Sequence, residues 1–185
     1  MTGVVEEVGL GTMSLQRFAA ALASAEPAPG GSTAAAVPGA LAAGLVAMAA
    51  RLTMASDPFS DLAFDLDAIA QEADELRVEL LELVDEDAEA FARVIEALGP
   101  PRATPDEIER AYEAAVEPPS HVCRLSSRVL ELADEVAARG DPHAAADARV
   151  AKLFASASLE AAAVTVETLS SAASARRREA SRRSR

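Results

Sequence analysis

The sequence predicts an all-α protein, an elongated bundle of several helices that is expected to dimerise. Apolar residues recur at spacings of three and four over long stretches, and no stretch shows sustained period-two alternation. With no Trp, one Tyr and five Phe, the core must consist of Leu, Val and much Ala, which suits closely packed helices. A chain of 185 residues most simply forms one domain, placed at 1–175, followed by an Arg-rich tail at 176–185.

A glycine loop at 27–33, Pro-Ala-Pro-Gly-Gly-Ser-Thr, is the feature around which the chain is organised. The two prolines stiffen the loop, and Gly30 and Gly31 let backbone approach a ligand or another chain closely. Ser32 or Thr33 can cap the helix that follows. A glycine loop that leads into a helix start is the first candidate site.

The run 34–50 after this loop contains only apolar residues, Gly and Pro, so its helix is expected to be buried on all sides. A membrane span is the competing interpretation. However, a span needs about 20 strongly apolar residues, whereas this run is shorter, consists mostly of Ala, Gly and Val, and contains Pro38. The composition favours the central helix of a soluble bundle, which either kinks at Pro38 or begins there.

Two helices flank this run. Ser14 is a plausible N-cap for a short amphipathic helix over 14–25. Asp57-Pro58 is typical of a helix start, and Gly99-Pro100-Pro101 ends the long helix that follows. Its inward seam comprises Leu62, Leu66, Ile69, Ala73, Leu76, Leu80, Leu83, Asp87, Ala90, Val94 and Ala97. One chain has little with which to cover so long a seam, so we expect a homodimer.

The second half of the chain predicts further helices. Thr104-Pro-Asp-Glu107 is a capping box for a helix to Glu117, which Pro118-Pro119 should break or kink. The apolar spacing then continues to Gly140, a stop signal, and Asp141-Pro142 caps the last helix. The inward positions expected on this last helix are Asp147, Ala151, Phe154, Ser158, Ala161, Thr165 and Thr168.

Asp87 is the most informative single residue, because an apolar seam does not accept a carboxylate without pairing or hydrogen bonding. Alternatively, the helix turns slightly and exposes Asp87, or an Arg neutralises it. Asp147 poses the same question, although it can also complement the dipole of its helix. Two inward acids would suit general acid and base catalysis. Arg51 could pair with a carboxylate or lie at the surface.

Composition also excludes several classes of function. The formal net charge of −13 argues against a nucleic-acid partner for the folded body. One Cys and two widely spaced His give no metal-ligand cluster. The lone cysteine forms no intramolecular disulfide and Met1 begins no secretory-type sequence, so we expect a cytoplasmic protein. The Arg-rich tail is expected to be a frayed helix end or a disordered extension, or else to contact an acidic surface.

Five segments of the chain occur together in one order. They are 27–36, Gly39-Ala-Leu-Ala-Ala, Arg51-Leu-Thr, Asp85-Glu-Asp-Ala-Glu-Ala-Phe, and Gly140-Asp-Pro followed by Asp147. Together they resemble the cyclodeaminase/cyclohydrolase family, which includes the C-terminal domain of formimidoyltransferase-cyclodeaminase and free-standing methenyltetrahydrofolate cyclohydrolases. The resemblance extends over residues 14–170, and the glycine loop is its most distinctive part.

The resemblance implies a dimeric, all-helical enzyme of tetrahydrofolate one-carbon metabolism, with no cofactor beyond its folate substrate and no metal. Such enzymes close 5-formimidoyltetrahydrofolate to 5,10-methenyltetrahydrofolate with loss of ammonia, or open the methenyl bridge with water. Which reaction applies stays open. The site residues expected for the folate-type ligand are Asp87 and Asp147 as catalytic acids and Gly30, Gly31, Ser32, Thr33, Arg51 and Thr165 as substrate-binding residues.

The sequence departs from the family pattern at four places. Ser32 replaces a third glycine, Pro38 an alanine-like residue and Ala146 a serine, and Thr165 lies near a usual asparagine. These departures keep a rival interpretation open, a non-catalytic helical scaffold that has lost the folate site. Another is a bundle whose apolar helix and Arg-rich tail bind a partner protein.

Overall fold

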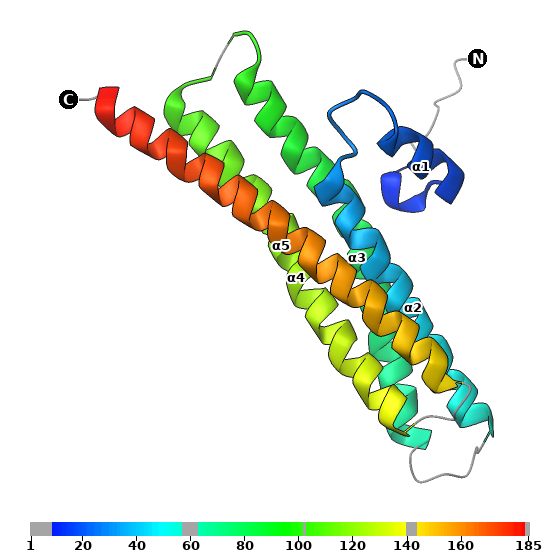
Figure 1. Cartoon of the computed structure of the whole chain (residues 1–185). Coiled ribbons are helices and arrows are strands. Elements are labelled where there is room, and N and C mark those ends of the chain that lie inside the picture. Colours follow the sequence, from blue (N-terminus) through cyan, green and yellow to red (C-terminus); the bar gives the residue numbers. More distant parts are fainter. Residues whose placement is uncertain (1–8, 57–62, 102, 140–143, 184–185) are drawn as a thin grey trace, which may run out of the picture.

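The computed structural model describes residues 9–56, 63–101, 103–139 and 144–183, and they form helices and connecting turns with no strand among them. The helices are a 3-10 helix η1 (Leu10–Thr12), α1 (Leu15–Leu22), α2 (Gly31–Ser56), α3 (Ala63–Leu98), α4 (Pro105–Arg139) and α5 (Ala144–Arg183). The predicted all-α class and the elongated bundle are confirmed (Figure 1).

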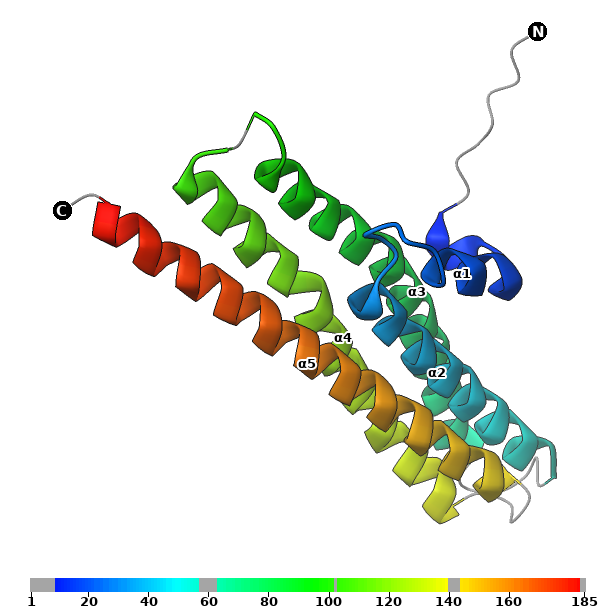
Figure 2. The same ribbon diagram turned by 45° about the horizontal axis from the view of Figure 1, so that its top comes forward.

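Helices α2 to α5 run alternately up and down, so each lies antiparallel to its neighbours in sequence (Figures 1 and 2). Because α2 is about ten residues shorter than α3, it covers only one part of the bundle. The molecule therefore has a four-helix body and an arm made of the end of α3, the start of α4 and the end of α5. Helix α1 lies beside the start of α2, where body and arm meet (Figure 2).

Helix α2 is the core helix, with buried residues along most of its length. The alternative that the helix starts at Pro38 is wrong, because α2 begins at Gly31 and continues through Pro38. It is also long and apolar enough to cross a membrane, and 61% of its most apolar window is buried in the bundle. The expectation that it is buried on all sides was wrong for one chain, because Leu41, Met48 and Leu52 keep 53%, 39% and 50% of their surface exposed.

The inward seam of α3 is confirmed, since its predicted positions from Leu66 to Val94 are buried. Helices α2 and α4 cover this seam within one chain. The dimer was expected on the ground that one chain could not cover the α3 seam. This reason was wrong, because the seam is already covered within one chain. The exposed apolar residues gather instead on α2 and on α5, where Val150, Leu153, Phe154 and Val164 are exposed.

Helix α4 begins with the predicted capping box: the Glu107 carboxylate accepts from Thr104 N (2.8 Å), and Glu107 N donates to the Thr104 hydroxyl (3.3 Å). The expected break at Pro118-Pro119 does not occur, because α4 continues through both prolines. Both rings are buried, so they extend the apolar seam from Ala115 to Val122. Packing here outweighs the loss of two helical hydrogen bonds.

On α5 the predicted inward positions Ala151 and Ser158 are confirmed, but at the other positions the buried residue lies one place from the predicted one or the site is only half-buried. The buried residues are Ala144, Ala148, Ala151, Ala155, Ser158, Ala162, Leu169 and Ala173. Asp147 and Thr165 are half-buried, and Phe154, Ala161 and Thr168 are exposed. An alanine-rich helix offers little size contrast between neighbouring positions, so the sequence pattern did not define its register.

The Arg-rich tail continues α5 as far as Arg183. Arg177 forms ion pairs with Glu109 and Glu113 of α4, so part of the tail contacts an acidic surface of its own chain. The expected stop at Gly140 and the caps at Asp57-Pro58 and Asp141-Pro142 lie outside the described residues. Helix α1 has its predicted N-cap, because Arg17 N donates to the Ser14 hydroxyl (3.3 Å).

Candidate functional site

The candidate site is built around Asp87, which lies on α3 at the junction of body and arm and is only 3% exposed. The Ser32 and Thr33 hydroxyls, from the first turn of α2, each donate to Asp87 Oδ2 at 2.7 Å. No ion pair among the described residues includes Asp87. Both alternatives considered from the sequence, an exposed Asp87 and one neutralised by an Arg, were therefore wrong.

The two oxygens of Asp87 differ in their surroundings. Both hydroxyls bind Oδ2, and no hydrogen bond found within the described part of the chain reaches Oδ1. Fully buried side-chain polar atoms all have partners in that same part of the chain. Since Oδ1 has no such partner, it is not fully buried, and it is the oxygen of Asp87 that remains available to a ligand. Burial raises the pKa of the Asp87 carboxyl above its ordinary value, and the Thr33 and Ser32 hydrogen bonds oppose this only in part.

Four helices pack closely about two helical turns from this site, on the side of the four-helix body. A Cβ added to Gly39 of α2 would lie 2.7 Å from Ser158 Oγ, 3.0 Å from Ser126 Oγ and 3.3 Å from Leu80 Cδ1. Ser158 donates to Ala35 O (2.6 Å), and its hydroxyl also shares a hydrogen bond with Ser126 (2.8 Å). Side chains from α3, α4 and α5 thus converge on one point of α2.

This crossing shows which residues face the site. Seven residues make almost two helical turns, so a residue seven positions along points the same way about 10 Å further on. We counted seven residues toward the arm from each residue of the crossing. Gly39 leads to Ser32, and Leu80 leads to Asp87. Ser126 leads to Pro119, and Ser158 leads to Thr165. The hydrogen bond between Ser32 and Asp87 verifies the count for α2 and α3. By the same count we expect Pro119 of α4 and Thr165 of α5 to face this layer.

The start of α2 also offers backbone donors. Ala34 N is the first amide that donates within the helix, to Gly30 O (2.9 Å), so the amides of Gly31, Ser32 and Thr33 precede the first helical hydrogen bond. Such amides bind anionic or polar oxygens. A Cβ added to Gly31 would meet no atom within 4 Å, so the open space beside Gly31 within one chain is compatible with a ligand there.

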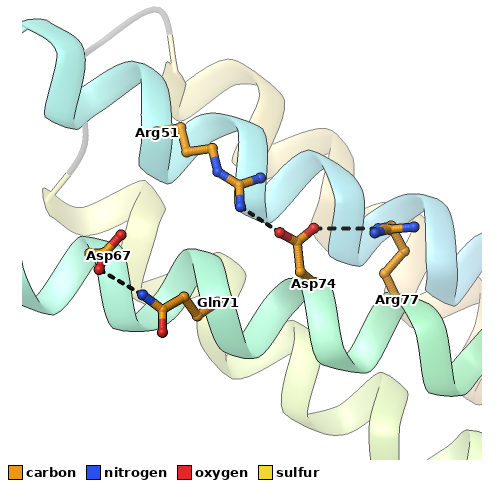
Figure 3. Close-up of polar contacts among 5 residues, drawn as sticks. All are labelled: Arg51, Asp67, Gln71, Asp74 and Arg77. Atoms are coloured by element: carbon orange, nitrogen blue, oxygen red, sulfur yellow. Dashed lines mark hydrogen bonds and ion pairs between the residues drawn. The ribbon is translucent and has the colours of Figure 1, made fainter.

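Arg51 lies at the other end of α2, 19 residues from Ser32 and about 28 Å away along the helix axis. Its guanidinium pairs with Asp74 of α3, which also binds Arg77 (Figure 3). The pKa of the Asp74 carboxyl is lowered chiefly by its hydrogen bond with Arg51. Within one chain, Arg51 is a surface ion-pair residue and is not part of the Asp87 site.

Asp147 is also remote, 18 residues or about 27 Å along α5 from Thr165. Within a single chain, Asp87 and Asp147 therefore lie far apart and do not share one site, and the catalytic role of Asp147 stays a prediction. The departure at Ala146 lies at the same far end and is exposed. The departure at Ser32, by contrast, places an additional hydroxyl directly on the site acid.

Sequence reasoning missed two features of this region. Pro119 was interpreted only as a helix breaker, and its place in the apolar seam of α4 was the signal that could have identified it. Asp85 was noted only as part of a matching segment, yet its carboxylate binds backbone amides of η1. Among the described residues no group of three or more His, Cys, Asp or Glu is placed to hold a metal ion.

Comparison with known proteins places this geometry in a family. The family model for formiminotransferase-cyclodeaminase matches residues 14–179. A methenyltetrahydrofolate cyclohydrolase from Methylorubrum extorquens is 36% identical over 163 residues, covering 84% of this chain and 78% of that protein. A formimidoyltransferase-cyclodeaminase from Gallus gallus is 32% identical over 134 residues, which are 69% of this chain but 24% of that longer protein.

A solved structure supports the same relationship. The crystal structure of a formiminotetrahydrofolate cyclodeaminase from Thermotoga maritima matches with a TM-score of 0.78 at 26% identity, covering 90% of this chain and 87% of that chain. Sequence and fold therefore agree over nearly the whole molecule, and the resemblance to this family is confirmed. The chain belongs to the formiminotransferase-cyclodeaminase family.

Proposed function

We propose that the protein is a cytoplasmic tetrahydrofolate one-carbon enzyme that opens or forms the 5,10-methenyl bridge, as a cyclohydrolase or a cyclodeaminase. The observation that carries the proposal is Asp87, a buried carboxyl with one oxygen fixed by two hydroxyls and the other available. A carboxyl of raised pKa exchanges protons nearer neutral pH than an ordinary one, which suits general acid and base catalysis. No cofactor beyond the folate is needed.

In the cyclohydrolase direction, water adds to the electrophilic methenyl carbon between N5 and N10. Asp87 Oδ1 takes a proton from this water as the carbon becomes tetrahedral. The protonated carboxyl then returns the proton to the ring nitrogen whose bond to that carbon breaks. As this bond breaks, the hydroxyl on the carbon loses its proton to solvent and becomes the carbonyl of a formyl group on the other nitrogen. Ser32 and Thr33 hold the carboxyl throughout, because both bind the oxygen that does not react.

In the cyclodeaminase direction, N10 adds to the carbon of the formimidoyl group on N5, which enters in its protonated amidinium form, so that the addition leaves an NH2 group on the carbon. Asp87 accepts the proton that N10 loses and delivers a proton to the departing amine, so ammonia leaves and the methenyl bridge remains. The amides of Gly31, Ser32 and Thr33, with Gly30 completing the loop, would hold a polar part of the folate. Thr165 is expected to face the same layer from α5. Arg51 and Asp147 have no role in this proposal for one chain.

A paired assay tests the proposal. The near-ultraviolet absorbance of 5,10-methenyltetrahydrofolate should fall when the purified protein opens the bridge. It should rise, with release of ammonia, when the protein closes 5-formimidoyltetrahydrofolate. Turnover in either assay supports the proposal and identifies which of the two reactions the protein catalyses. Folate binding with no turnover in either would favour the non-catalytic scaffold, and no binding at all would overturn the proposal.

The pH dependence should respond to the hydroxyls on Asp87. Each hydrogen bond stabilises the carboxylate and lowers its pKa, so Ser32→Gly should raise the pKa of Asp87 further. Because the base form must be ionised, the acid limb of the kcat/KM profile should move to higher pH. Ser56→Gly, at the exposed far end of the same helix, serves as the control. An acid limb that stays in place in Ser32→Gly would contradict the role given to Asp87.

We also propose a homodimer formed through the apolar face of α2 and α5. This face consists of Leu41, Met48, Leu52, Val150, Leu153, Phe154 and Val164, all at least 39% exposed. An apolar surface that extends over two neighbouring helices is typical of an interface between subunits. The face lies mostly on the four-helix body and leaves the strongly charged side of α3 uncovered.

Light scattering at micromolar concentration should give twice the chain mass of 19.1 kDa. Leu153→Glu should give a monomer, because its charge would be buried in the interface at a cost of several kcal/mol. Phe64→Glu is the matched control, since Phe64 is 84% exposed at the start of α3 and outside the α2/α5 face. A monomeric native chain would contradict the dimer, and a dimeric Leu153→Glu variant would contradict this interface.

A further inference from the structure

The segment before the glycine loop is held against α3 by a second acid, Asp85. Asp85 Oδ1 accepts from Leu10 N (2.5 Å), and Oδ2 accepts from Gly11 N (3.2 Å). We call residues 9–30 the N-terminal strap. It comprises η1, α1 and the loop that ends at Gly30 (Figure 2).

Gly9, which precedes η1 as its N-cap, and Gly11 within η1 make this contact possible. A Cβ added to Gly11 would lie 2.3 Å from Leu81 O of α3, and one added to Gly9 would lie 2.8 Å from Asp85 Oδ2. A contact of 2.3 Å with a backbone oxygen cannot be relieved by a side-chain rotation. The backbone of η1 therefore lies directly on α3, and only glycine at position 11 permits this approach.

The rest of the strap is attached by a few apolar side chains. Phe18 and Pro29 are buried, Leu10, Met13 and Leu22 pack half-buried against the core, and Leu15 is 73% exposed. A segment with few buried contacts opens more readily than the bundle beneath it. The two hydrogen bonds of Asp85 add to this packing at the start of the strap.

The end of the strap enters the site itself. Gly30 N donates to Thr33 Oγ1 (3.4 Å), and Thr33 and Ser32 bind Asp87. The start of the strap thus bonds Asp85 directly, and its end is linked to Asp87, two residues further along α3, through Thr33. We therefore expect release of η1 from Asp85 to loosen the turn that holds the Asp87 carboxyl.

We propose that Asp85 is a positioning residue, which holds the N-terminal strap so that the first turn of α2 keeps its place over Asp87. The inference rests on the proposed folate function of the Asp87 site. Asp85 does not itself meet the substrate, because both of its oxygens are bound to η1. Its removal should release the strap, weaken substrate binding at Gly31 to Thr33, and leave the proton exchange at Asp87 largely intact.

Two variants break the contact from opposite sides. Asp85→Ala removes the acceptor, and Gly11→Ala displaces η1 while every acid remains. Each should raise KM about tenfold, equivalent to about 1.4 kcal/mol, while kcat changes less than about threefold. Asp85→Asn keeps one acceptor oxygen and should fall between Asp85→Ala and the native protein. Glu86→Gln, an exposed neighbour on α3, is the control and should behave as the native protein does.

Limited trypsin digestion gives a readout that does not depend on folate activity. Arg17 lies in α1, so a released strap should be cleaved at the Arg17–Phe18 bond several-fold faster in Asp85→Ala and Gly11→Ala, as followed by mass spectrometry. Unchanged cleavage would overturn the proposal, and so would faster cleavage with unchanged KM. A native protein without any folate turnover would defeat the proposed function, while the cleavage rates would still report whether Asp85 holds the strap.

Discussion

Asp87→Asn should lower turnover of a methenyl or formimidoyl folate by a factor of about 10² to 10⁴, the usual cost of a lost general acid or base. The amide is nearly isosteric and can still accept from Ser32 and Thr33, so the site should keep its shape. What it cannot do is take a proton from water or from N10. Substrate binding should therefore change much less than kcat.

The stability of Asp87→Asn should distinguish this role from a structural one. Burial raises the pKa of Asp87 in the folded state, so folding favours the protonated carboxyl. The stability from this residue is complete below the pKa of the unfolded chain and is lost as pH rises through the higher folded pKa. At neutral pH the asparagine variant should then melt at the same temperature as the native protein or higher, and this advantage should disappear in acid.

Thermal melts across pH, together with the turnover assay, provide the measurement. Glu86→Gln, which changes an exposed acid on the same helix, should alter neither quantity. A variant that is as active as the native protein would show that Asp87 is not the proton carrier. A variant that melts well below the native protein at neutral pH would show instead that the carboxylate is a structural partner.

Gly39→Ala should lower the free energy of unfolding by about 1 to 3 kcal/mol, the usual cost of overpacking. The new Cβ would lie 2.7 Å from Ser158 Oγ, a buried hydroxyl that is held by Ala35 O and by Ser126. Moving that hydroxyl breaks its hydrogen bonds, and four helices must separate slightly. Urea denaturation would measure the loss.

Gly44 on the same helix offers a control in which the same substitution should raise the free energy of unfolding. A Cβ added to Gly44 would have only an ordinary contact of 3.6 Å with Arg77, so Gly44→Ala should gain up to about 1 kcal/mol from helix propensity. Ser158→Ala combined with Gly39→Ala should lose less stability than the two single changes summed. If Gly39→Ala proves as stable as Gly44→Ala, the close crossing at Gly39 is not as tight as the structure indicates.

The sequence by itself determined the helical class, the seams of α3 and α4, and the buried acid Asp87 as the candidate site residue. These signals are strong because Leu, Ile and Val contrast sharply with charged neighbours, so Asp87 is conspicuous in an apolar seam. The glycine loop and the serine and threonine after it were likewise identified from residue type alone. Local chemistry was enough to predict the capping box at Thr104 and the N-cap at Ser14.

Only the tertiary structure decided which residues meet. Asp87 and Asp147 looked equivalent as inward acids, but helix direction and length separate the two ends of the bundle by more than 25 Å. Arg51 was separated from the site for the same reason. The register of α5 and the continuity of α4 through Pro118-Pro119 depended on packing against other helices, which outweighs local propensity. The attachment of η1 to Asp85 joins residues about 75 positions apart, a contact that no local pattern specifies.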